Sequence, residues 1–102
     1  MIVKPLGNES NGTRSVEIRT GEVSYRALLR IIRKIRDAVV METAYDPMND
    51  NARIIVKYKD VMITVETPFS DYVINCRSPS AAFDEFISQL RNYRVRWWER
   101  LI

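Results

Sequence analysis

The sequence predicts an α+β domain, in which an antiparallel β-meander of three to five strands packs against two main helices in the approximate order β-α-β-β-β-β-α. Two observations lead to this prediction. Apolar residues recur with the 3.6-residue period of a helix near residues 25–39 and 79–101, and they alternate with period two between these segments. Asp, Asn, Pro and Ser divide the alternating part into short runs, which is typical of strands joined by turns.

The N-terminal part predicts two short strands before the first helix. Residues 2–6 form a short edge strand, because Pro5 cannot donate to a central sheet ladder. Asn11-Gly12 indicates a tight turn. Val16 and Ile18 then alternate with charged residues, as in a half-buried strand.

The first helix is expected from Ser24, a good N-cap, through residue 25 to about Val39. One stripe of this helix is apolar and belongs to the core: Tyr25, Leu28, Leu29, Ile31, Ile32, Ile35 and Val39. The other side is basic and contains Arg26, Arg30, Arg33 and Lys34.

Four alternating segments follow, at residues 39–45, 54–58, 61–65 and 72–76, and they predict the meander with one face buried. In the first segment, strict alternation places Val39, Met41, Thr43 and Tyr45 on one face.

The last helix is expected to open at Ser78 and Pro79, as N-cap and first helical residue. Its apolar stripe is Phe83, Phe86, Ile87, Leu90, Tyr93, Trp97 and Leu101. The stripe allows a helix that runs nearly to the C-terminus, but Arg94 falls inside the stripe and Val95 outside it, so an end or bend near Tyr93 is the alternative. Trp97 is expected in the core, and Trp98 at its margin, where Trp beside Arg is a favoured interface anchor.

Residues 1–102 are expected to form a single domain, and their composition argues against conventional catalysis. The chain has no histidine, whose pKa of ~6.5 serves most acid–base chemistry, and one cysteine, Cys76. Hydrolase triads, zinc sites and dithiol centres are therefore not expected, and neither is a cofactor. Cys76 is expected to be a buried, inert thiol. A single cysteine and the absence of a long apolar run favour a cytoplasmic protein outside the membrane.

Charge is unevenly distributed along the chain, although the net charge is only +3. Residues 1–41 carry eight basic and four acidic groups, residues 42–85 carry four basic and eight acidic groups, and residues 86–102 carry four basic groups and one acidic group. The ends are thus basic and the middle is acidic.

Metal-dependent chemistry finds little support in this acidic middle. Asp46-x-Met48-x-Asp50 lacks the oxygen ligand and the glycine that a calcium loop needs at its third and sixth positions. Asp60, Glu66 and Asp71 are candidate magnesium ligands of a nuclease, but no E-x-K spacing follows them.

Histidine-free RNA cleavage is the enzyme alternative, because messenger-RNA interferase toxins use Arg, Lys and Tyr for this chemistry. The residues available for it are Lys57, Tyr58, Lys59, Arg77, Tyr93 and Arg94. The acidic sheet region does not favour this alternative.

RNA binding without catalysis is a second alternative, carried by the basic helix face of Arg26, Arg30, Arg33 and Lys34. The α-β-β-β-α order from residue 24 to 101 resembles the layout of a double-stranded-RNA-binding domain. That family grips phosphates with a basic cluster opening its second helix, and residues 78–84 contain no basic residue.

In size and layout the whole chain resembles small bacterial immunity proteins of toxin–immunity systems of the contact-dependent growth inhibition type. The resemblance implies a non-enzymatic cytoplasmic antitoxin that neutralises a toxin domain by direct binding. An acidic surface complements a basic toxin, so the expected partner-facing residues are Asp46, Asn49, Asp50, Asp60, Glu66, Asp71 and Trp98. A secretion chaperone that dimerises and exposes an apolar sheet groove is a further alternative.

Overall fold

The computed structural model describes residues 1–8, 14–19, 21–46, 48–49, 51–67, 71–76 and 81–100. They form six strands, two α-helices and a short C-terminal 3-10 helix, which confirms the α+β class and the expected order of elements. The strands are β1 (Lys4–Asn8), β2 (Arg14–Ile18), β3 (Ala38–Asp46), β4 (Asn51–Tyr58), β5 (Val61–Glu66) and β6 (Tyr72–Cys76). The helices are α1 (Tyr25–Lys34), α2 (Ala81–Asn92) and the 3-10 helix η1 (Trp97–Arg100).

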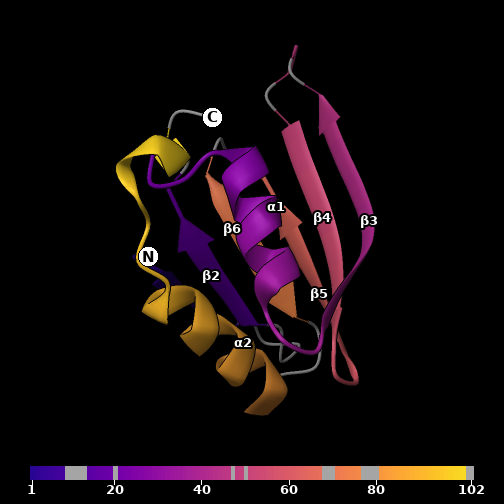
Figure 1. The fold of residues 1–102 in the computed structure, drawn as a ribbon. Coiled ribbons are helices and arrows are strands. Elements are labelled where there is room, and N and C mark those ends of the chain that lie inside the picture. Colours follow the sequence, from indigo (N-terminus) through magenta and orange to yellow (C-terminus); the bar gives the residue numbers. More distant parts are fainter. Residues whose placement is uncertain are drawn as a thin grey trace.

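All six strands belong to one antiparallel sheet in the order β1-β2-β6-β5-β4-β3 (Figure 1). Strands β3 to β6 form the predicted meander. Strand β2 joins the meander by pairing with β6, where Val16 lies opposite Ile74. Strand β1 lies at the edge, as Pro5 requires, and this N-terminal hairpin raises the strand number to six from the three to five expected.

Both helices cover one face of the sheet and bury a single core. In β4 every second residue is buried, from Ala52 to Tyr58, so this strand presents one face to the helices. Both helices add apolar side chains to the same cluster, and the largest of these are Leu28, Ile32, Phe83, Phe86 and Leu90. Cys76 is buried in this core, as predicted.

Helix α1 begins as predicted and ends earlier than predicted. The Ser24 side chain caps it by accepting a hydrogen bond from the Ala27 amide at 3.2 Å. The helix ends at Lys34, and the chain reverses through Asp37, whose φ of 69° is incompatible with a right-handed helix. The expected extension to Val39 is therefore wrong: Val39 lies in β3 and is 55% exposed.

Strand β3 contains a bulge that changes which residues share a face. The register shifts between Val40 and Glu42, so Met41 has no partner residue on β4. After the shift, Thr43 pairs with Ile54, whose side chain is in the core. Thr43 and Tyr45 therefore share the core-side face with Val40, and the expected grouping with Val39 is wrong.

Helix α2 ends at Asn92, which confirms the alternative of an end or bend near Tyr93. Residues 93–96 leave the helix before η1 begins at Trp97. Ser78 and Pro79, the expected start of this helix, lie outside the described residues.

The two α-helices are short, at ten and twelve residues. A bilayer span needs about 20 apolar residues. Within the described ranges, none of the helices has the length and apolarity to cross a membrane.

Candidate functional site

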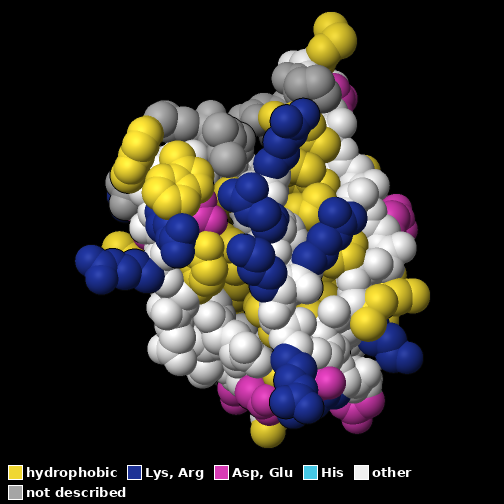
Figure 2. All heavy atoms as spheres, in the orientation of Figure 1, with side chains coloured by type: hydrophobic (Ala, Val, Ile, Leu, Met, Phe, Trp, Pro, Cys, Tyr) yellow, Lys and Arg dark blue, Asp and Glu magenta, His cyan; other side chains and the backbone are white. Residues whose placement is uncertain are grey.

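Helix α1 presents a row of arginines to solvent. Ala27, Leu28 and Ile31 face the sheet, which leaves Arg26 and Arg30 on the outer side. The steps from Arg26 to Arg30 and from Arg30 to Arg33 are four and three residues, so the three side chains form one stripe about 10 Å long. Lys34 is exposed beside this stripe, and α1 contains no acidic residue. Figure 2 shows Lys and Arg side chains crossing this face of the molecule over α1.

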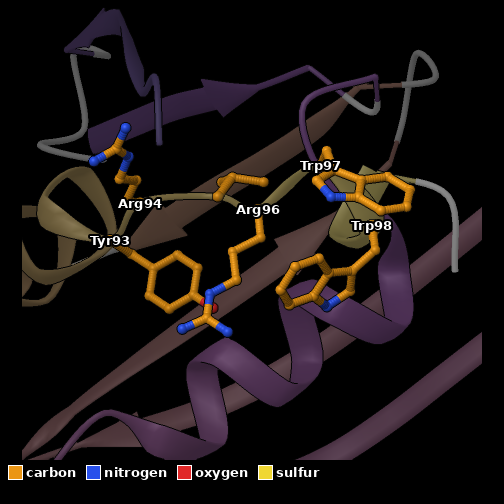
Figure 3. A pocket seen from close by; sticks show the side chains of 6 residues that line it. Tyr93, Arg94, Arg96, Trp97 and Trp98 are labelled. Carbon is orange, nitrogen blue, oxygen red and sulfur yellow. The ribbon is translucent and has the colours of Figure 1, made fainter.

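The segment after α2 forms a hollow beside the helix, with a volume of about 410 Å³ (Figure 3). It is lined by Tyr93, Arg94, Val95, Arg96, Trp97 and Trp98. Trp97 is 73% exposed and Trp98 is 38% exposed. The expectation that Trp97 anchors the core is therefore wrong: α2 has already ended, so the helical period no longer directs this side chain toward the sheet.

Glu99 fixes this segment against the start of α1. The residue is 2% exposed, and its side chain accepts hydrogen bonds from the Tyr93 hydroxyl at 2.8 Å and the Arg96 amide at 2.9 Å. Its carbonyl oxygen accepts a hydrogen bond from the Ser24 amide at 2.8 Å, and its carboxylate lies 3.8 Å from the Arg30 guanidinium. The C-terminal segment and the arginine stripe are therefore held side by side.

The surroundings of Glu99 favour its charged form. Burial by itself raises the pKa of this carboxyl. The hydrogen bonds from Arg96 and Tyr93, together with the positive charges of Arg30 and Arg96, outweigh burial and hold the pKa below its ordinary value. The same environment raises the pKa of Tyr93, first through burial and then through its bond to Glu99.

Arg96 packs against one of the two tryptophans. Its guanidinium lies over the Trp98 ring, 5.1 Å from the ring centroid, in a cation–π contact. The Trp97 and Trp98 rings meet edge to face, with centroids 6.0 Å apart and planes at 89°. We define the Arg–Trp surface as Arg26, Arg30, Arg33, Arg96, Trp97 and Trp98. The structure thus brings Trp98 and the predicted basic helix face into one surface.

Asp60 lies apart from the other predicted acidic residues that the structure describes. Asp46 and Asn49 belong to the β3–β4 hairpin, whereas Asp60 lies in the β4–β5 turn, beyond the other end of β4. A strand of eight residues separates the two positions by about 24 Å. Glu66 and Asp71 flank the β5–β6 connection, which lies at the same end of the sheet as the β3–β4 hairpin, because Glu66 pairs with Arg53 near the start of β4. Asp50 lies outside the described residues.

Asp46 and Glu66 have partners within the protein. The Asp46 carboxylate accepts hydrogen bonds from the Met48 amide at 3.0 Å and the Asn49 side-chain amide at 2.6 Å. The bond from Asn49 is the main reason why the pKa of Asp46 lies below its ordinary value. Glu66 lies 3.9 Å from Arg53 across β4 and β5. In the part of the chain that the structure describes, no three Cys, Asp or Glu side chains converge as metal ligands would.

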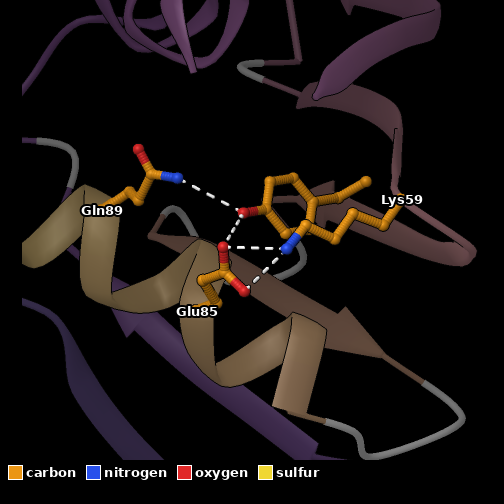
Figure 4. Close-up of polar contacts among 4 residues, drawn as sticks. Lys59, Glu85 and Gln89 are labelled. Atoms are coloured by element: carbon orange, nitrogen blue, oxygen red, sulfur yellow. Dashed lines mark hydrogen bonds and ion pairs between the residues drawn. The ribbon is translucent and has the colours of Figure 1, made fainter. Parts of the chain in front are cut away.

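The residues considered for RNA cleavage are also separated. Tyr58 is fully buried, and its hydroxyl donates to Glu85 at 2.9 Å and accepts from Gln89 at 3.3 Å (Figure 4). Lys59 donates to the same carboxylate at 2.9 Å. These bonds raise the pKa of Lys59 and lower that of Glu85.

The remaining members of that set do not complete a site around Tyr58. Lys57 is exposed on the opposite face of the sheet from Tyr58, because neighbouring residues of a strand point to opposite faces. Tyr93 and Arg94 lie beyond the end of α2, and the Tyr93 hydroxyl is bonded to Glu99. Arg77 is outside the described residues.

Sequence reasoning missed Arg96, Trp97 and Glu99 as functional or positioning residues. The signal that could have found them is the break of the apolar stripe at Arg94. If the helix ends there, its period no longer directs Trp97 and Trp98 toward the core. Glu99 is the one acidic residue in residues 86–102, beside four arginines, which predicts that it pairs with a basic residue.

No protein-family model, curated protein or solved structure matches this chain.

Proposed function

We propose that this protein is a non-enzymatic binding module that binds single-stranded nucleic acid through the Arg–Trp surface. The supporting observation is that Glu99, through its contacts with Ser24 and Arg30, holds the segment that carries the exposed Trp97 against the helix that carries the arginine stripe. Arginine binds phosphate groups in a sequence-independent way. A solvent-exposed tryptophan offers a face on which an unpaired base stacks. The combination matches the phosphates and the bases of a nucleic-acid strand.

The exposed ring of Trp97 favours a single strand over a duplex. The face of a base becomes available to Trp97 only where the strand is unstacked.

The proposal is tested by fluorescence anisotropy with a labelled 12-nucleotide single-stranded RNA, and with a DNA of the same sequence, over a range of salt concentrations. The variant is Arg26→Gln/Arg33→Gln, because these arginines are exposed and Glu99 is held by Arg30 instead. We expect at least tenfold weaker binding than wild type. The slope of log K against log salt should fall by about 1.4, since each lost phosphate contact removes about 0.7 for a single strand.

The matched control is Arg53→Gln/Lys57→Gln, which removes the same charge from the face of the sheet opposite the helices. It should change affinity no more than about twofold. Equal losses in both variants would mean that net charge alone attracts the strand. Absence of binding by wild type at low salt would contradict the proposal.

A second candidate is the immunity function, which the β3–β4 hairpin supports. The hairpin extends beyond the rest of the sheet (Figure 1), and Met48 near its tip is 93% exposed next to Asp46 and Asn49. A projecting apolar side chain flanked by a carboxylate and an amide suits insertion into a basic protein cleft.

The immunity candidate has a test that separates it from nucleic-acid binding. The protein is co-expressed with a toxin encoded by the adjacent reading frame, and growth is measured. Asp46→Lys/Met48→Ala should abolish protection, whereas Arg26→Gln/Arg33→Gln should preserve it. Protection that survives the hairpin changes would contradict this candidate.

A further inference from the structure

We infer that the hollow lined by Tyr93–Trp98 is a subsite for one unstacked nucleobase of the bound strand. This inference rests on the proposed function and specifies how the same surface engages its ligand. The volume of about 410 Å³ lies within the roughly 300–1,000 Å³ range of sites for small molecules, so a single nucleoside is a suitable occupant.

The two tryptophans differ in what they can offer to a base. One side of the Trp98 ring is covered by the Arg96 guanidinium, and the Trp98 ring also contacts the Trp97 ring edge to face. Trp97 is 73% exposed and therefore has an open face. Trp97 is the stacking platform, and the perpendicular Trp98 ring forms a wall beside it.

Arginines on the same segment serve the phosphates on either side of that base. Figure 3 shows the Arg94 and Arg96 side chains leaving the segment on opposite sides. Both are exposed. A strand that crosses this segment with one base on Trp97 thus has a guanidinium on each side of the segment for its phosphates.

The arrangement also distinguishes a base from a simple anion. A polyanion without bases uses the arginines and gains nothing from the open indole face. Stacking on an aromatic side chain contributes on the order of tenfold in affinity for each base. The separation of these two contributions provides the test.

The experiment compares a 12-nucleotide single-stranded RNA with inorganic polyphosphate of similar length as ligands for three proteins: wild type, Trp97→Ala and Trp97→Phe. We expect Trp97→Ala to bind RNA about tenfold more weakly and to bind polyphosphate as wild type does. Trp97→Phe keeps an aromatic face and should stay within about threefold of wild type for RNA. The salt dependence of RNA binding should be the same in all three proteins, because no phosphate contact is removed.

The outcomes separate this inference from the proposed function. If wild type binds RNA and Trp97→Ala binds it equally well, the base subsite is wrong and the proposed function stands. If Trp97→Ala weakens the binding of RNA and of polyphosphate to the same extent, Trp97 maintains the shape of the surface, and the base subsite is again wrong. If wild type binds no single strand, the proposed function fails and the subsite fails with it. Circular dichroism checks that the variants are folded, which the exposure of Trp97 leads us to expect.

Discussion

Glu99 is the residue on which the position of the C-terminal segment depends. A buried carboxylate is costly unless hydrogen bonds and opposite charges compensate for lost water. Here the Tyr93 hydroxyl, the Arg96 amide and the Arg30 guanidinium provide that compensation. The same contacts hold Trp97 and Trp98 beside α1, so the stability of this segment and the shape of the Arg–Trp surface are linked.

Replacing Glu99 by Gln should lower the free energy of unfolding by about 2 kcal/mol at pH 7, because the charge-assisted bonds become neutral ones. The folded-state pKa of Glu99 lies below its unfolded value. Its carboxylate therefore stabilises the protein above about pH 4.3, the unfolded value, and this contribution is lost as the pH falls through the folded value.

Urea unfolding between pH 3 and pH 7 measures both effects of the Glu99→Gln change. The difference between wild type and variant should shrink toward the acid end. Glu42→Gln on β3, where the side chain is exposed, serves as the control and should be nearly neutral. A pH-independent difference between wild type and Glu99→Gln would contradict the assigned role of the charge.

Tyr58 is a second residue whose polar end is engaged inside the protein. Tyr58→Phe removes one hydrogen bond to Glu85 and one from Gln89 while keeping the edge-to-face contact with Phe86. We expect a loss of about 1 kcal/mol in the free energy of unfolding. Tyr45→Phe, on an exposed ring, is the matched control for denaturant titration. An equal loss in the two variants would show that the network of Figure 4 adds no stability.

At the level of elements, local patterns predicted the start of α1 more accurately than its end. Ser24 combines a capping side chain with the start of an apolar stripe, and both signals agree. The end of α1 has no such signal, because Ile35 and Val39 continue the helical period by coincidence. The bulge at Met41 is equally hidden, since it depends on pairing with β4.

The connection from α1 to β3 depends on the positive φ of Asp37. Asp37→Val should destabilise the protein by about 1–2 kcal/mol, because a β-branched side chain is strained in the left-handed region. Asp37→Gly should be neutral or slightly stabilising, because glycine adopts this conformation without strain. Thermal unfolding of both, beside Arg36→Val as a control on the neighbouring exposed residue, checks this expectation. Equal effects of Val at positions 36 and 37 would contradict it.

For the whole molecule, the sequence was sufficient for the fold class and insufficient for the candidate site. Periodicity and turns are local, so they predicted the helices and the meander. The Arg–Trp surface depends on contacts between Glu99 and residues of α1, which are far apart in the sequence. The net charge of residues 42–85 is a property of a stretch of sequence and does not show where each charge lies on the surface. In the structure, β4 places Asp46 and Asp60 at opposite ends of the sheet.

The order of strands predicts how stability is distributed across the sheet. Strands β4, β5 and β6 have a hydrogen-bonded neighbour on each side, whereas β1 and β3 have one. Amide hydrogen exchange followed by NMR should therefore be slowest in β5 and fastest at the outward-facing amides of β3. Protection of β3 equal to that of β5 would mean that another chain covers this edge in solution.

Both outer strands also share an irregularity. The register of β1 shifts between Pro5 and Gly7, and that of β3 shifts between Val40 and Glu42. A straight strand from a neighbouring molecule cannot form a continuous hydrogen-bond ladder along an edge that is interrupted in this way. The sheet is therefore protected against growth into fibrils at its two open sides, and the protein should remain dispersed when it is concentrated.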